Sequence, residues 1–175
     1  VGKMGGELEV RSNVGKGTCF DVAIPIEMAT LEETANEDVE ISSELLTVPI
    51  NILVVDDNDI NRLVLASMLE RFNYVPDEAD NGEVAVEMAR AKRYDLIFMD
   101  CAMPVLDGMS ATKIIMQEGL LSKYGRVVAV TANTTAEDKI SCSEAGMADF
   151  LSKPVVQSDV TAQVRTTLNA KSITA

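Results

Sequence analysis

Residues 52–57, Ile52-Leu53-Val54-Val55-Asp56-Asp57, join an unbroken apolar run to two adjacent acids. Two further unbroken apolar runs follow at residues 96–99 and 127–130, and weaker strand patterns lie at residues 75–79 and 148–152. Continuous apolar runs are typical of strands that are covered on both faces of a parallel sheet. The sequence therefore predicts a five-stranded parallel sheet in its longer, C-terminal part.

Helical patterns lie between these strands. The apolar residues that carry them are Ile60, Leu63, Val64 and Met68 in one segment, and Val160, Val164 and Leu168 in another. Both sets have helical spacing. Thr134 and Glu137 fit a capping box at the start of a further helix. Because strand and helix alternate, the predicted fold class is α/β, a doubly wound parallel sheet with helices on both faces.

Polar side chains stand where the predicted strands end. They are Asp56 and Asp57 after the first strand, Asp100 at the end of the third, Thr131 at the end of the fourth and Lys153 after the fifth. In a doubly wound sheet the carboxyl ends of the parallel strands share one edge, and ligands bind there. We expect these five side chains to converge.

Such a cluster has a definite chemistry. Three neighbouring carboxylates repel one another unless a cation lies among them, and ligation by oxygen alone suits Mg²⁺. A metal held by Asp57, Asp100 and a nearby carbonyl would leave Asp100 one oxygen free as a nucleophile. Lys153 and Thr131 can then contact a phosphoryl group. Singly, each residue has an ordinary explanation as a turn acid, a loop threonine or a surface lysine, but together they favour phosphoryl transfer.

Four segments resemble response-regulator receiver domains. They are residues 54–58, residues 99–108, residues 130–133 and residues 151–154, with fitting intervals between them. The resemblance runs from residue 51 to about residue 170, and it implies a flavodoxin-like fold with five parallel strands in the order 2-1-3-4-5. It also implies a cis peptide bond before Pro154.

The same resemblance assigns roles to individual residues. It implies that Asp100 is phosphorylated and that Mg²⁺ is held by Asp56, Asp57, Asp100 and the carbonyl of Ala102. It further implies that Lys153 contacts the phosphoryl group and that Thr131 and Phe150 form a conformational switch. Two positions depart from the common pattern. Ala102 stands where relatives often have a polar residue, and Phe150 lacks the hydroxyl of a tyrosine switch.

The N-terminal part has a different character. Residues 7–10 and 20–24 alternate polar and apolar around Gly15-Lys16-Gly17, which predicts a β-hairpin. Together with Met4-Gly5-Gly6, this hairpin resembles the end of a histidine-kinase ATPase domain. We therefore expect residues 1–27 to be the incomplete end of such a domain, residues 28–48 to be an acidic linker and residues 49–172 to be the receiver. This is the layout of a hybrid histidine kinase, and the first residue, Val1, suggests a piece of a longer chain.

Composition limits the partners. The formal net charge of −13 argues against nucleic-acid binding, and we expect no membrane contact by this segment. The chain has no histidine. We therefore expect both the phosphohistidine donor and the downstream partner, a histidine phosphotransfer protein, to lie outside it.

Cys19, Cys101 and Cys142 lack metal-ligand spacing, which predicts reduced thiols in a cytoplasmic segment. The parent kinase could be membrane-anchored elsewhere.

Two alternatives to an active receiver remain open. A phosphohydrolase of the haloacid-dehalogenase type also uses an aspartate nucleophile and Mg²⁺, and Asp57-Asn58-Asp59 fits its acid spacing. That class needs a further acidic motif after the lysine, where only Asp159 appears. A degenerate receiver that serves only for docking is the second alternative, and a phosphorylation assay separates it from the active form.

Overall fold

The computed structural model describes residues 7–13, 15, 17–23, 25, 48–132 and 135–172. The chain divides into two compact units, residues 1–36 and residues 37–175. Met4-Gly5-Gly6 and nearly all of the predicted acidic linker lie outside the described residues.

The larger unit is built on the predicted five-stranded parallel sheet. Its strands are β3 (Ile52–Val55), β4 (Asp77–Ala79), β5 (Tyr94–Asp100), β6 (Leu121–Thr131) and β7 (Asp149–Ser152). Their order in the sheet is β4-β3-β5-β6-β7, with every neighbouring pair parallel. Counted within this unit, that is the predicted order 2-1-3-4-5. All residues of β3 and β5 are buried, as expected for strands covered on both faces.

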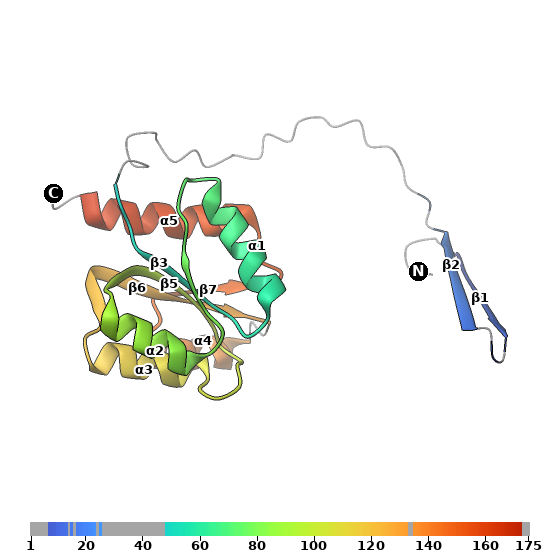
Figure 1. Ribbon diagram of the computed structural model, residues 1–175, viewed down its shortest axis with the longest axis horizontal. Helices are drawn as coiled ribbons and strands as arrows, with labels where there is room; N and C mark the ends of the chain where they lie inside the picture. Colours follow the sequence, from blue (N-terminus) through green and yellow to red (C-terminus); the bar gives the residue numbers. More distant parts are fainter. Residues whose placement is uncertain are drawn as a thin grey trace. The chain divides into compact units, whose positions relative to one another are not determined.

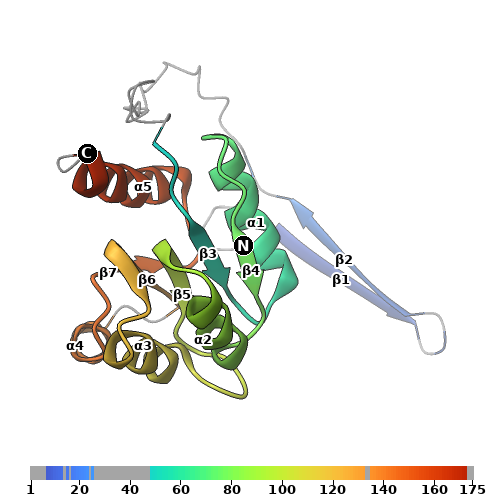
Figure 2. The ribbon, with the colours of Figure 1, turned by 60° about the vertical axis from the view of Figure 1, so that its left-hand side comes forward.

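Five helices cover the two faces of this sheet. They are α1 (Asp59–Glu70), α2 (Gly82–Ala91), α3 (Gly108–Gln117), α4 (Ala136–Glu144) and α5 (Gln157–Ser172). Figures 1 and 2 show α1 and α5 on one face and α2, α3 and α4 on the other. Each face has its own apolar core, so the doubly wound fold is confirmed. None of the described helices combines the length and the apolar character that a membrane span needs.

The start of α4 differs from the prediction by one residue. Thr135, not Thr134, is the N-cap, and its hydroxyl accepts a hydrogen bond from the backbone N–H of Asp138 at 3.2 Å. Thr134 itself lies outside the described residues. The two adjacent threonines each have an acid three residues later, so the capping pattern alone does not distinguish them.

Helix α1 carries apolar side chains on two sides. The prediction of a helix is confirmed, but three of the four residues that carried its periodicity face solvent: Ile60, Leu63 and Val64. The residues of α1 that pack into the core are instead Leu65, Ala66 and Leu69. In α5, by contrast, the periodic residues Val160, Val164 and Leu168 are fully buried. Helix α1 therefore has an apolar stripe that the described fold leaves exposed.

The smaller unit contains the predicted β-hairpin. Strand β1 (Glu7–Asn13) pairs antiparallel with β2 (Gly17–Ala23), with Val10 opposite Phe20. Gly15 and Gly17 have φ values of +78° and +100°, a region that favours glycine, and this explains why the turn contains them. Val10 and Phe20 are both exposed. A two-stranded sheet is marginal by itself, and the assignment of residues 1–27 to a kinase domain stays a prediction.

Candidate functional site

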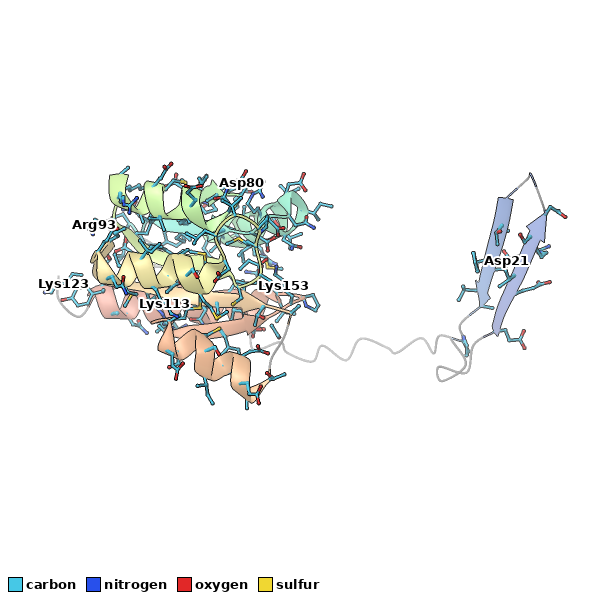
Figure 3. All side chains as sticks on the ribbon, turned by 90° about the horizontal axis from the view of Figure 1, so that it is seen from below. Asp21, Asp80, Arg93, Lys113, Lys123 and Lys153 are labelled. Atoms are coloured by element: carbon cyan, nitrogen blue, oxygen red, sulfur yellow. The ribbon has the colours of Figure 1, made fainter. Side chains whose placement is uncertain are left out.

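Three strand ends bring four of the predicted polar side chains to one edge of the sheet. Asp56 and Asp57 follow β3, and Asp100 is the last residue of the neighbouring strand β5. Lys153, labelled in Figure 3, follows β7. These residues are up to 97 positions apart in sequence, yet their side chains meet, as parallel strand ends require.

The three acids form a compact oxygen cluster. Asp56, Asp57 and Asp100 each offer a carboxylate oxygen, and these atoms all lie within 4.8 Å of one another. Asp56 and Asp100 are buried, whereas Asp57 is exposed. Hard oxygen donors at this separation, open to solvent on one side, suit Mg²⁺, which keeps several of its waters. The residues present therefore fit the expected metal.

Lys153 bridges the two buried acids. Its ammonium nitrogen donates to Oδ2 of Asp56 and to Oδ2 of Asp100, each at 2.7 Å. Burial lowers the pKa of Lys153, but the bonds to Asp100 and Asp56 outweigh burial and raise it above its ordinary value. The lysine therefore stays charged and offsets part of the negative charge of the cluster.

Asp100 is buried beside two hydrogen-bond donors. Burial raises the pKa of its carboxyl above the ordinary value, although Lys153 and the backbone N–H of Ala102 both act to lower it. That N–H donates to Oδ1 of Asp100 at 3.2 Å. Desolvation of this kind strengthens the interaction of the carboxylate with a cationic or electrophilic group that enters the site.

Asp56 is held by residues that the sequence analysis did not single out. Its Oδ1 accepts from the backbone N–H of Asn58 at 2.9 Å and from the side chain of Asn61 at 3.0 Å. The guanidinium of Arg62 donates to the carbonyl of Asp56 at 2.8 Å. All three lie at the start of α1, directly after the acid pair. The feature that could have identified them in the sequence is their position directly after a strand end, because the first turn of the following helix must lie beside the site.

Gly108 gives α3 the room to start against Asp100. A Cβ atom at this position would lie 2.0 Å from the carbonyl oxygen of Asp100, which no side chain tolerates. The backbone N–H of Gly108 donates to the carbonyl of Cys101 at 3.2 Å. The glycine in the segment of residues 99–108 is therefore required for the close approach of helix and strand.

The two predicted switch residues lie nearby on neighbouring strands. Thr131, at the end of β6, is half-buried, and its carbonyl accepts from the backbone N–H of Lys153 at 2.8 Å. Phe150, on β7, is half-buried, and the ammonium of Lys139 from α4 lies 4.2 Å from the centre of its ring. The Lys153–Pro154 peptide bond is cis, as expected.

The sequence that forms this sheet and its site matches a known protein family. The family model of the response regulator receiver domain matches residues 52–165, well over half of the chain. The chain belongs to the response regulator receiver family. This membership favours the receiver over a phosphohydrolase of the haloacid-dehalogenase type.

Relatives of this receiver chain include large histidine kinases. It is 41% identical over 123 residues to "Hybrid signal transduction histidine kinase B" of Dictyostelium discoideum, a match that covers 65% of this chain and 6% of that protein. It is 31% identical over 164 residues to "Aerobic respiration control sensor protein ArcB" of Escherichia coli (strain K12), which covers 93% of this chain and 20% of that protein. The chain thus spans a fifth or less of the length of these relatives.

Solved receiver structures share its fold. The receiver domain of the sensor histidine kinase PA1611 from Pseudomonas aeruginosa PAO1, solved with a magnesium ion coordinated in its active site cleft, aligns with a TM-score of 0.62 and 35% identity, over 70% of this chain and 99% of that one. The receiver domain of Ssk1 from Saccharomyces cerevisiae was solved with the histidine phosphotransfer signaling protein Ypd1. It aligns with a TM-score of 0.60 and 33% identity, over 66% of this chain and 86% of that one.

Proposed function

We propose that this receiver accepts a phosphoryl group from a phosphohistidine onto Asp100 and passes it to a histidine phosphotransfer partner. The observation that carries the proposal is the convergence of Asp56, Asp57 and Asp100 within 4.8 Å, with Lys153 bonded to two of them. A nucleophilic carboxylate, a metal cluster and a cation are the groups that one phosphoryl transfer requires.

In this proposal each residue has a distinct task. A carboxylate oxygen of Asp100 attacks phosphorus, the P–N bond breaks, and its electron pair stays on the imidazole, which takes up a proton. The product is an acyl phosphate on Asp100. Asp56, Asp57 and Asp100 with the Ala102 carbonyl would hold Mg²⁺, which would neutralise charge at the phosphoryl oxygens.

Two further side chains complete the proposed site. Lys153 turns from its carboxylate partners to the phosphoryl group, and the Thr131 hydroxyl donates a hydrogen bond to it. Movement of Thr131 toward the phosphoryl group is coupled to Phe150, which changes its packing because it has no hydroxyl to exchange. These two residues would convert phosphorylation into a change at the surface formed by α4 and β7.

The exposed stripe of α1 supports a protein partner at this edge. Ile60, Leu63 and Val64 form this stripe, and Val64 also lines a pocket of about 200 Å³ between α1 and the loop after β7. Asp56 and Lys153 lie at the same pocket. An exposed apolar stripe on the helix beside a reactive group is typical of a docking surface. We infer that the histidine-bearing partner docks here, which brings its histidine to Asp100.

The parent protein is proposed to be a hybrid histidine kinase. The hairpin of residues 7–23 has no covering partner among the described residues of its own unit, and a match to a large sensor protein covers 93% of this chain. We therefore propose residues 1–27 as the end of the kinase ATPase domain, residues 28–48 as the linker and residues 49–172 as the receiver. Because the chain has no histidine, the donor histidine belongs to another domain or chain.

Phosphorylation with acetyl phosphate and Mg²⁺ tests the proposal directly. We expect one base-labile acyl phosphate, mapped to Asp100 by mass spectrometry after borohydride trapping. Asp100→Asn should abolish labelling, since an amide is not a nucleophile here, and Asp57→Asn should abolish it through loss of the metal. Asp80→Asn is the matched control, because Asp80 also follows a strand of this sheet but lies outside the acid cluster. Label that persists in Asp100→Asn would refute the proposal, and an unlabelled wild-type chain would indicate a docking-only receiver.

A further inference from the structure

Two thiols meet beside the phosphoacceptor site. The Sγ atoms of Cys101 and Cys142 lie 3.7 Å apart, although the residues are 41 positions apart in sequence. Both cysteines are free. Cys101 directly follows Asp100 and is half-buried, and Cys142 is buried in the core on the α2–α3–α4 face.

The contact involves the residue by which helix α4 enters the core. All residues of α4 are described, and Cys142 is the single buried one among them. The helix lies between the two switch residues, since it follows Thr131 and precedes Phe150. A bond between the two sulfurs would therefore join the loop after the phosphoacceptor to the segment that connects the switch residues.

The separation of the sulfurs is small enough for a covalent bond. A disulfide has an S–S length of about 2.05 Å, so the two sulfurs need to approach by about 1.6 Å, within reach of a rotation of each side chain about its Cα–Cβ bond. We propose that Cys101 and Cys142 form a reversible intramolecular disulfide that fastens α4 to the loop after Asp100.

The oxidant in this proposal is a low-molecular-weight disulfide. The sulfur of Cys101, the more accessible of the two, attacks the reagent disulfide, whose S–S bond breaks and releases one thiol. The sulfur of Cys142 then attacks the Cys101 sulfur of this mixed disulfide and releases the second reagent thiol. In sum the two cysteines lose two electrons and two protons, and the reagent disulfide gains both.

The reduced pair is the resting form. Cys101 is half-buried and Cys142 is buried, so a small disulfide has little access to either sulfur and exchange is slow. Because Cys142 is the one buried residue of α4, we expect local opening of this helix to expose the two thiols and to provide the route. In a reducing compartment the bond is transient and reports an oxidising episode.

The test uses the full 175-residue chain with Cys19→Ser, which removes the exposed third thiol on the hairpin. The chain is incubated with oxidised glutathione, denatured, alkylated and mapped by mass spectrometry. We expect a Cys101–Cys142 disulfide that dithiothreitol reverses. Cys142→Ser in the same background should instead accumulate glutathione on Cys101, because no second thiol resolves the mixed disulfide. Full alkylation of both cysteines after oxidation, or no glutathione on Cys101 in the Cys142→Ser variant, would overturn the proposal.

A second measurement follows the consequence for α4. Amide hydrogen exchange in α4 should slow several-fold in the oxidised chain, and unchanged exchange would refute the fastening of the helix. The expected regulation, slower labelling of Asp100 by acetyl phosphate in the oxidised chain, rests on the proposed phosphoacceptor function. If Asp100 takes no phosphate in either redox state, that function fails while the disulfide mapping still stands or falls by itself.

Discussion

Val105 has an unusual backbone for a β-branched residue. It lies in the loop between β5 and α3 with φ of +70°, and the backbone N–H of Leu106 donates to the carbonyl of Pro104 across it at 2.9 Å. Its side chain is 77% exposed, so packing does not offset the cost of this conformation. The carbonyl of Leu106 accepts from Gly82 at 3.1 Å, which ties the loop to the start of α2. The strain is therefore imposed by the loop next to Asp100.

Val105→Asn is expected to stabilise the receiver. Asparagine tolerates a positive φ better than valine does, and little packing is lost at an exposed site. We expect the free energy of unfolding in urea to rise by about 0.5–1 kcal/mol. Val75→Asn is the control, since Val75 is 82% exposed and is not among the residues with positive φ. Equal effects of the two substitutions would show that the backbone at Val105 is not strained.

The prediction for helix α1 was correct about the helix but wrong about which of its sides is buried. The apolar periodicity of residues 60–68 correctly predicts a helix, but the sequence also holds a second apolar set in which Leu65 and Leu69 face the core. Periodicity identifies a stripe, and it does not show which of two stripes packs against the sheet. The exposed stripe became visible only in the assembled fold.

The exposed stripe predicts a selective defect. Leu63 is 68% exposed, so Leu63→Glu should leave the fold and the labelling of Asp100 by acetyl phosphate unchanged. Transfer between Asp100 and a histidine phosphotransfer protein should slow by about tenfold or more, because a charge replaces an apolar contact. Val75→Glu, at a residue that is also exposed but lies before the amino end of β4, should transfer normally. Equal transfer rates in both variants would exclude α1 as the docking surface.

At the opposite edge of the sheet, α5 is fastened to β5 through a buried acid. Asp95 accepts from the backbone N–H of Asn51 at 2.8 Å, from the Ser122 hydroxyl at 2.6 Å and from the Lys171 ammonium at 2.9 Å. Burial raises the pKa of Asp95, but these three hydrogen bonds outweigh burial, so the pKa lies below its ordinary value. The folded state therefore favours the ionised form.

This acid predicts a pH-dependent loss of stability. Because the pKa of Asp95 is lower in the folded chain than in the unfolded chain, its contribution is complete above the ordinary pKa near 4 and is lost as the pH falls through the folded value. Asp95→Asn should lower the free energy of unfolding by about 1–3 kcal/mol at pH 7. Urea unfolding should show that the difference from wild type shrinks below about pH 4. A difference that stays constant with pH would contradict the assignment.

The whole molecule divides into a hairpin unit and a receiver unit. We expect residues 37–175 alone to melt within about 1 °C of the full chain, since a separate compact unit has its own core. Acetyl phosphate should label Asp100 at the same rate in both. Differential scanning calorimetry and the labelling assay test this, and a large fall in melting temperature on removal of residues 1–36 would mean that the hairpin supports the receiver.

The sequence was sufficient for the sheet and the acid cluster because these depend on buried strands and on the polar residues at their ends, whereas the strand order came from the resemblance to receiver domains. It was not sufficient for contacts that depend on how a helix rotates over the sheet. The thiol contact between Cys101 and Cys142 is one example, since it requires the position of α4 relative to β5. The contact of Asn61 with Asp56 is another, because an exposed helical asparagine has no distinctive pattern.

The fastening of Lys171 has a consequence for how the receiver is joined to other proteins. Its ammonium also donates to the carbonyl of Pro49 at 2.7 Å, so the two ends of the receiver lie side by side. Both ends are at the amino edge of the sheet, whereas Asp100 is at the carboxyl edge. Such a module can be attached by either end, or inserted into a loop of a host protein, without covering its reactive edge.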